Sequence, residues 1–296
     1  MNRRQMIYAW GLVWGALSAI CYAANPLGAV MLYQLGYGTS TVLLYRFGFA
    51  ALILAAIMLV RRDRFRIGGR DLGVAVILGL LFVVCSQTFY ESFRLMSVGI
   101  ACTILFCYPV MTAVLMALFF HEKITGRTAG AIALAVAGIA VLSLGKGGNV
   151  VTASGLTLVL VSALAYAVYI VVVGKAHVRV PVSTLTFWAI SFCFLGLSAY
   201  AAFTSGTAAF RLPASPGAWF WAVFLGLFPS VLALVFLAMS TRRIGSTPAA
   251  ILGALEPVAA VAIGICLLGE VFTAQLAFGI VLVLAAVLLI VCRKPC

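Results

Sequence analysis

Long apolar stretches alternate with short polar segments along the whole chain. Ten of these stretches are each about 20 residues long or longer, and they occupy residues 8–33, 40–60, 71–93, 98–120, 126–145, 154–174, 183–203, 217–239, 247–268 and 273–292. A helix needs about 20 mostly apolar residues to cross the hydrocarbon core of a bilayer. The pattern therefore predicts an all-α polytopic membrane protein with ten transmembrane helices, surrounded by the lipid bilayer.

The composition agrees with this class. Of the 296 residues, 65% are hydrophobic and only 8% are charged, whereas an average soluble domain is about 25% charged. So few charges cannot cover a water-facing surface. Most of the eight cysteines lie inside the apolar stretches and no CxxC pair occurs, so we interpret them as small core residues.

The net charge of +13 reflects membrane orientation and does not indicate a nucleic-acid partner. When the N-terminus is placed in the cytoplasm, fifteen of the nineteen Lys and Arg fall at the termini or in inner loops. The outer loops then hold only Arg94, Lys146 and Arg211. This distribution follows the positive-inside rule. It predicts a multi-pass protein of the inner (plasma) membrane with both termini in the cytoplasm.

The chain contains an internal repeat. A shift of 148 residues aligns "PVMTAVLMALFFHEKIT", which begins at Pro109, with "PVAAVAIGICLLGEVFT", which begins at Pro257. Upstream, "ALSAICYAA" resembles "LVSALAYAV", which pairs Ser18 with Ser162. We therefore predict two five-helix repeats, residues 1–148 and 149–296. Because five is odd, the second repeat enters the membrane in the opposite orientation, as in many secondary transporters.

The two Pro-to-Glu segments, each followed by a short Gly- and Ala-rich helix, resemble the EamA-type branch of the drug/metabolite transporter superfamily. The resemblance covers nearly the whole chain, and overall the chain looks like the exporters of the YddG type. That likeness implies export of aromatic amino acids and other amphipathic metabolites. His121 stands where Gly is commoner in the family, at the turn before Glu122.

The fifth and tenth stretches, 126–145 and 273–292, offer almost no polar side chains to a substrate. We expect them to pack at the periphery, with Gly126, Gly130 and Gly138 on a close-packing face. The resemblance implies that such helices lie outside the transport core, in contact either with the rest of the chain or with a second copy. The protein is expected to be a monomer or a homodimer.

Polar and aromatic side chains interrupt the other stretches. An amide or hydroxyl in hydrocarbon needs a partner or a wet cavity, so we expect one shared cavity near the midplane. Its predicted substrate-binding residues are Tyr22, Asn25, Arg46, Gln87, Tyr90, Tyr108, Tyr166, Tyr169, Trp188 and Glu256. Buried Tyr and Trp also pack between helices or anchor them at the lipid interface, and that alternative stays open here.

Four prolines interrupt apolar stretches: Pro26, Pro109, Pro229 and Pro257. Each removes one backbone hydrogen bond and crowds the carbonyl four residues earlier. They predict either static kinks or hinges whose freed carbonyls face the cavity. Glu122 and Glu270 end their stretches at opposite faces, where we expect local capping or pairing, with gating as a second option.

Arg46 and Glu256 are the basic and the acidic residue that lie well inside a stretch. A charge at a helix centre costs about 2.5–3.5 kcal/mol on insertion scales, so each needs a partner. Three hypotheses follow: an ion pair between them; Arg46 at the outer interface with Glu256 facing a wet cavity; or contact of Arg46 with a substrate carboxylate and of Glu256 with an ammonium.

The sequence lacks the motifs that are typical of several other classes of protein. No Walker A sequence occurs, and Thr125 replaces the second His of the zinc motif HExxH. We therefore predict no enzyme, cofactor or metal. The leading hypothesis is a secondary transporter of a small molecule that works by alternating access around a midplane cavity. The alternatives are a carrier for a drug, sugar or nucleotide-sugar, and a channel-like or scaffold membrane protein.

Overall fold

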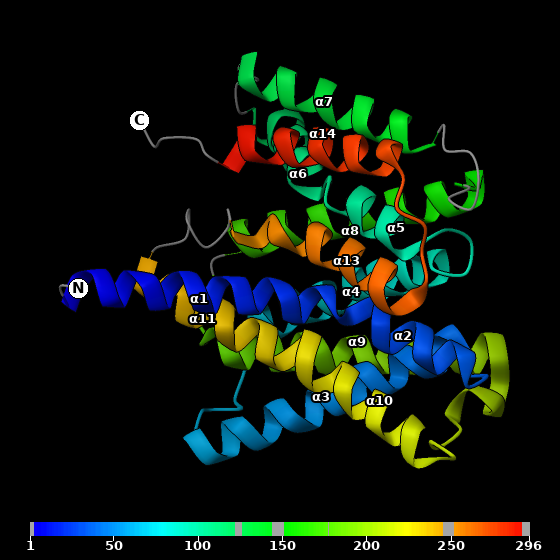
Figure 1. The fold of residues 1–296 in the computed structure, drawn as a ribbon. Coiled ribbons are helices and arrows are strands. Elements are labelled where there is room, and N and C mark those ends of the chain that lie inside the picture. Colours follow the sequence, from blue (N-terminus) through cyan, green and yellow to red (C-terminus); the bar gives the residue numbers. More distant parts are fainter. Residues whose placement is uncertain (1–2, 122–125, 144–150, 177, 245–251, 292–296) are drawn as a thin grey trace.

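The computed structural model describes residues 3–121, 126–143, 151–176, 178–244 and 252–291. Throughout these residues the regular structure is helical. The helices run roughly along one common direction, and the start of α1 and the end of α14 lie on the same side of the bundle (Figure 1). Each apolar stretch begins and ends near polar, Gly or Pro residues, which is why the helices stop there and the connections are short.

The first half of the chain forms seven helices: α1 (Arg3–Ala23), α2 (Asn25–Gln34), α3 (Thr39–Arg61), α4 (Gly69–Ser92), α5 (Val98–Leu105), α6 (Tyr108–Phe120) and α7 (Gly126–Ser143). The described part of the second half forms α8 (Ala153–Lys175), α9 (Val182–Ser205), the 3₁₀ segment η1 (Gly206–Phe210), α10 (Pro216–Leu227), the π-helical segment η2 (Phe228–Leu232), α11 (Ala233–Ile244), α13 (Leu255–Leu268) and α14 (Ala274–Val291).

Seven helical stretches in the described part of the chain are long and apolar enough to cross a membrane. Three shorter apolar helices, Thr128–Leu142, Leu255–Leu268 and Ala274–Leu289, fall in the stretches predicted as crossings five, nine and ten. The predicted start of crossing nine, at Thr247 and Pro248, lies outside the described residues. The all-helical membrane class is confirmed, and the count of ten stays a prediction.

Each of the four prolines lies at a break in a helix. Pro26 and Pro109 are the second residues of α2 and α6, and Pro257 lies in the first turn of α13. Pro229 lies inside the π-helical turn of η2, between α10 and α11. The missing N–H of proline and the clash of its ring with the preceding turn account for these positions. The predicted kinks are therefore present, while hinge motion stays a prediction.

The two halves of the chain contact each other through matched helix pairs. α1 of the first half packs on α11 of the second, and α8 of the second packs on α4 of the first. The Ser18 hydroxyl donates to the Ala233 carbonyl across the first pair, at 2.8 Å. The Ser162 hydroxyl donates to the Cys85 carbonyl across the second pair, also at 2.8 Å. The serines that the sequence aligns thus make equivalent bonds to the opposite half.

Two glycines allow a second matched contact. Gly79 of α4 lies against Phe192 of α9, and Gly226 of α10 lies against Phe49 of α3. A methyl group at Gly79 would lie 2.6 Å from the Phe192 side chain, and one at Gly226 would lie 3.1 Å from the Ala50 backbone nitrogen. The first spacing is too short for a side chain, and the second is tighter than ordinary contact, with the Phe49 Cβ closer still to the Gly226 position. Glycine therefore lets each helix approach the opposite half closely.

The fifth and tenth stretches pack on each other at one edge of the bundle, as α7 and α14 (Figure 1). Gly138 lies against Val283, and the Gln275 amide donates to the Val141 carbonyl. The peripheral position is as expected, and this packing lies within one chain. Among the described residues, nothing approaches the positions where side chains of Gly126 and Gly130 would project, so the close-packing face holds only for Gly138.

Glu270 joins the end of α13 to the start of α5. Its carboxylate accepts a hydrogen bond from the Gly99 backbone N–H at 3.1 Å and another from the Val98 N–H. Free N–H groups and the helix dipole make a helix start favourable for a carboxylate. Burial raises the pKa of Glu270, and the two N–H donors oppose that rise. Glu270 therefore caps a helix, as expected, whereas Glu122 lies outside the described residues.

The turn before each glutamate has the same backbone form. Gly269 ends α13 with a φ of +71°, and His121, its repeat equivalent, ends α6 with a φ of +54°. A left-handed residue is a common way to end a helix and favours Gly. His121 nevertheless makes the same turn, so the departure from the family pattern at this residue has not changed the local backbone.

We expect Glu270→Gln to lower the thermal stability of the detergent-solubilised protein. An amide retains one acceptor oxygen but presents an N–H₂ group to the second N–H donor. The loss of one charge-assisted bond in a part-buried site is expected to reduce stability by about 1.5–3 kcal/mol. Thermal unfolding followed by intrinsic fluorescence measures the change. Asp63→Asn is the matched control, because its 4.0 Å pair with the exposed Arg61 is worth about 0–1 kcal/mol; equal unfolding temperatures for the two variants would contradict the capping role.

Candidate functional site

A buried polar network lies where α2, α3, α4 and η2 meet. The Arg46 guanidinium donates to the Tyr90 hydroxyl at 3.2 Å and to the Ser230 hydroxyl at 3.3 Å. The Tyr90 hydroxyl in turn donates to the Asn25 side-chain oxygen at 2.5 Å. Arg46 is 6% exposed, Asn25 7% and Tyr90 fully buried. Three of the sequence-predicted residues are therefore hydrogen-bonded to one another in the core.

The charge of Arg46 is not neutralised by a carboxylate within this network. Among the described residues the ion pairs are Arg61 with Asp63 and Arg94 with Glu91. The guanidinium lies instead 5.0 Å from the Phe47 ring centre and 5.5 Å from that of Tyr90, which supplies cation–π attraction. The ion pair with Glu256 is not formed, and the side chain does not reach an interface. A buried cation without a counter-ion favours an anionic ligand.

Aromatic rings extend from Arg46 into the space between α4, α6 and α8. The Phe47 ring centre lies 5.6 Å from that of Phe82, which lies 5.3 Å from Tyr169. Tyr169 lies 5.9 Å from Tyr166, and Tyr166 lies 4.7 Å from Tyr108. Edge and offset contacts at these spacings are favourable for aromatic pairs. We call these five residues the aromatic wall. It includes the three deep tyrosines predicted from the sequence.

Glu256 lies in the first turn of α13, one residue before Pro257, and is half-buried. It is within electrostatic range of Arg46, Tyr22 and Tyr108. No hydrogen bond or ion pair joins Glu256 to another residue of the described part of the chain. Tyr22 also lies within range of Tyr169. Glu256 and Tyr22 thus belong to the same central region, where Glu256 retains its acceptor capacity.

Trp188 lies away from this centre, at the start of α9. Its indole N–H donates to the Phe65 carbonyl at 2.9 Å. Nearby, the Thr184 hydroxyl donates to the Arg64 carbonyl at 2.7 Å. The buried Asp71 carboxylate accepts a hydrogen bond from the Arg179 backbone N–H at 3.3 Å. These bonds hold the segment between α3 and α4 against the second half of the chain. We call this set the α9 clamp.

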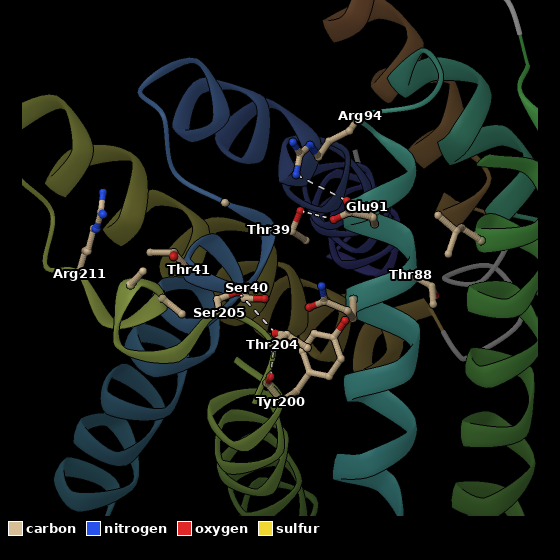
Figure 2. Close-up of a pocket in the computed structure, with 15 residues that line it drawn as sticks. Thr39, Ser40, Thr41, Thr88, Glu91, Arg94, Tyr200, Thr204, Ser205 and Arg211 are labelled. Carbon is tan, nitrogen blue, oxygen red and sulfur yellow. Dashed lines mark hydrogen bonds and ion pairs between the residues drawn. The ribbon is translucent and has the colours of Figure 1, made fainter. Parts of the chain in front are cut away.

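Gln87 lies one turn from Tyr90 on α4 and lines a cavity of about 610 Å³ at the opposite end of the bundle. We call this cavity the vestibule (Figure 2). Its walls come from the start of α3, the end of α4, Leu158 of α8 and the end of α9 with η1. Their polar residues include Thr39, Ser40, Thr88, Glu91, Arg94, Tyr200, Thr204, Ser205 and Arg211. These residues were not predicted from the sequence, because polar residues near helix ends are expected at any membrane surface.

Among the described residues, the central region offers hydrogen-bonding groups, ring faces, and a cation and a carboxylate that have no ion-pair partner. These groups can orient a small molecule, but they provide no evident nucleophile or acid–base pair. No group of three or more His, Cys, Asp or Glu side chains able to hold a metal ion occurs in the described part of the chain. The groups of the central region suit the binding of a small molecule, and the central region is therefore the candidate site.

Comparison with known proteins agrees with this description. The model of the EamA-like transporter family matches residues 9–144 and 153–292, one copy in each half. An uncharacterized transporter of Archaeoglobus fulgidus is 28% identical over 92% of this chain and 94% of its own length. The uncharacterized transporter YdfC of Bacillus subtilis is 25% identical over 61% of this chain, and the match spans 58% of that relative. A crystal structure with 18% sequence identity shares the fold, with a TM-score of 0.65 over 94% of this chain and 95% of that one.

We expect Tyr90→Phe to destabilise the protein. The substitution leaves the Asn25 oxygen and one Arg46 nitrogen without their partner in a buried site, which is expected to reduce stability by about 1–3 kcal/mol. Thermal unfolding of the purified protein measures it. Tyr8→Phe, at a tyrosine that is 50% exposed, removes the same hydroxyl and should leave the unfolding temperature unchanged. If both variants unfold like the wild type, the network makes no net contribution to stability.

Proposed function

The chain belongs to the EamA-like transporter family, and we propose that it is a secondary carrier that exports small amphipathic metabolites, with aromatic amino acids as the leading substrate class. The observation that carries this proposal is the buried Arg46 charge, without a carboxylate partner, next to the aromatic wall. A cation beside ring faces suits a ligand that carries both a carboxylate and an aromatic group.

The three parts of an aromatic amino acid each have a matching group in the central region. The substrate carboxylate would pair with Arg46, its ammonium with Glu256, and its ring with the aromatic wall. Such pairing is stronger in a dry site than in water because the local dielectric is low. In this proposal the substrate supplies the counter-charges that Arg46 and Glu256 lack.

The same observations weigh against two of the alternatives. Arg46 is a single cation, whereas a dianionic phosphate of a nucleotide-sugar needs more positive charge. The Arg46 network fills the centre with hydrogen-bonded side chains, which is unlike the open, continuous pore of a channel. The aromatic wall would also suit ring-containing drugs, so a drug carrier is the second candidate function.

The transport mechanism we propose is alternating access. Matched contacts between the halves, at Ser18 and Ser162 and at Gly79 and Gly226, support two repeats of inverted topology that rock about the central region. The proline breaks would absorb the bending. The vestibule lies at one end while the α9 clamp joins the halves at the other, which supports a state open at the vestibule end.

The orientation we propose places both termini in the cytoplasm and the vestibule at the outer face of the inner (plasma) membrane. This follows from the distribution of Lys and Arg.

Glu256 is the group that would exchange a proton if transport is coupled to a pH gradient, because it is the free carboxylate of the central region. A uniporter would not need it.

Purified protein in proteoliposomes should show saturable uptake and counterflow of L-phenylalanine or L-tryptophan within a panel that includes sugars and nucleotide-sugars. Arg46→Gln should reduce uptake at least about ten-fold, because a buried charge-assisted bond is worth about 1.5–3 kcal/mol. Arg66→Gln is the matched control, at an exposed arginine outside the bundle. Non-saturating, ohmic conductance would support a channel and overturn the carrier.

Glu256→Gln should impair transport of zwitterionic L-phenylalanine while sparing 3-phenylpropionate, which has no ammonium group. The amide keeps the size of the side chain but removes its charge. Uptake of both compounds is measured with and without a pH gradient, and an effect of the gradient lost in the variant would assign proton coupling to Glu256. Unchanged folding together with unchanged uptake of both compounds would contradict substrate contact by Glu256.

A further inference from the structure

Ser230 lies at the break between α10 and α11, in the π-helical turn η2, and it is 7% exposed. In an α-helix the Leu225 carbonyl would accept a hydrogen bond from the backbone N–H of residue 229. Pro229 has no N–H to donate. The Ser230 hydroxyl supplies a donor in its place and bonds to the Leu225 carbonyl at 3.1 Å. The side chain of Ser230 therefore satisfies a buried carbonyl that Pro229 cannot satisfy.

The Ser230 hydroxyl has one proton, and the bond to the Leu225 carbonyl uses it. Its oxygen is then an acceptor, and the Arg46 Nε–H donates to it at 3.3 Å. Tyr90 follows the same pattern, since its hydroxyl donates to the Asn25 oxygen at 2.5 Å and accepts from Arg46 Nη1 at 3.2 Å. Each hydroxyl is thus committed as an acceptor for the guanidinium, and hydrogen bonds arranged in series strengthen one another.

Two bonds from neighbouring nitrogens fix the plane of the Arg46 guanidinium, one to Ser230 and one to Tyr90. A guanidinium carries its N–H donors in a rigid planar fork. No other hydrogen bond from Arg46 is formed within the described part of the chain. Arg46 is 6% exposed, so its side chain is not completely enclosed. The donors that these two bonds leave over are therefore held at a fixed orientation, and a carboxylate binds best to such an oriented fork.

The break at Pro229 is not shared by the two halves of the chain. The segment "LGLLF" of α4 aligns with "LGLFP" of α10 and η2. Phe82 stands at the position equivalent to Pro229, and α4 is a continuous helix through it. Val83, the equivalent of Ser230, has no hydroxyl. The repeated fold therefore needs neither a proline nor a serine at this point, and the bond to Arg46 is the property that distinguishes the second copy.

We propose that Ser230 is a positioning residue for Arg46, which holds the guanidinium in the orientation that binds a substrate carboxylate and so sets the preference for carboxylate-bearing substrates. Ser230 acts through Arg46 and does not itself bind the carboxylate. This inference rests on the proposed function, in which Arg46 pairs with that group. It gives the proline break a second role, because the turn that interrupts the helix also supplies the acceptor that orients the charge.

Ligand-induced thermal stabilisation of the purified full-length protein measures binding without requiring transport. The probes are 3-phenylpropionate, which has the carboxylate but no ammonium, and phenethylamine, which has the ammonium but no carboxylate. Ser230→Ala should raise the dissociation constant of 3-phenylpropionate about ten-fold, because the guanidinium loses one of its two anchors. The constant for phenethylamine should change by less than about two-fold. Equal changes for the two probes, or no change for either, would overturn the positioning role.

Two further variants separate positioning from a general loss of structure. Ser191→Ala is the matched control, because the Ser191 hydroxyl of α9 donates to the Phe187 carbonyl at 2.8 Å and makes no bond to Arg46. Both dissociation constants should stay at the wild-type value in this variant. If Ser230→Ala does not fold, Ser230→Cys keeps the size of the side chain and replaces the hydroxyl with a weakly hydrogen-bonding thiol. The same loss of about ten-fold, confined to 3-phenylpropionate, is expected.

A double-mutant cycle tests whether Ser230 acts through Arg46. In the Arg46→Gln background, Ser230→Ala should change the dissociation constant of L-phenylalanine by less than about two-fold, because the guanidinium that Ser230 orients is absent. A further loss of about ten-fold would show that Ser230 acts independently of Arg46, and would overturn the proposal.

The same measurements distinguish this inference from the proposed function. Binding that depends on Arg46 but not on Ser230 would retain the proposed carboxylate contact and reject the positioning role. The expected shift between the two probes in a protein that shows no saturable transport would retain the positioning role and reject the carrier. No stabilisation of the unsubstituted protein by any of the three compounds would reject the proposed substrate class, and the positioning role with it.

Discussion

Hydrogen-bonding groups inside an apolar bundle have no water to bond, and the architecture of this protein depends on that constraint. Many of the buried polar side chains described above bond to a distant part of the chain. Ser18 and Ser162 bond to backbone carbonyls of the opposite half, and Glu270 bonds to the free N–H groups at the start of α5. Between apolar helices in lipid the hydrophobic effect adds little to association, so these bonds and the close glycine contacts specify which helices meet.

The contacts between helices, which form the frame of the protein, recur in the two halves, whereas the side chains of the central region differ between them. Serine bonds, glycine contacts and the left-handed turns at His121 and Gly269 recur in both halves. Arg46 belongs only to the first half and Glu256 only to the second, where Tyr108 is its repeat equivalent. A symmetric frame favours two conformations of similar energy, while an asymmetric interior favours one orientation of a bound molecule. Both properties suit a carrier.

The two ends of the bundle are also unlike. At one end Trp188 and Thr184 bond to backbone carbonyls of the segment between α3 and α4. At the other end the same two helices, α3 and α4, line the vestibule. α4 thus runs from the α9 clamp to the vestibule, and on the way it carries Tyr90 of the central network and Gln87 of the vestibule wall. A movement of α4 relative to α9 would therefore change all three regions together.

The sequence by itself determined the membrane class and the proline breaks, and it predicted the two repeats and most of the residues of the central region. These follow from local properties: apolar length, a repeated motif, a missing N–H, and polar side chains where lipid excludes water. Asn25, Arg46 and Tyr90 were predictable as buried polar groups, and the deep tyrosines as members of one region.

Only the tertiary structure decided which of these groups are partners. Arg46 bonds to Tyr90 and Ser230 instead of Glu256, because helix crossing places α4 and η2 beside it. Trp188 lies at the α9 clamp, since its depth depends on where α9 begins against α4. The vestibule could not be predicted from the sequence. Thr39, Glu91, Tyr200 and Arg211 come from four separate segments, and polar residues are common near the ends of membrane helices. Periodicity and composition record the neighbours along a chain, and a cavity between helices depends on neighbours in space.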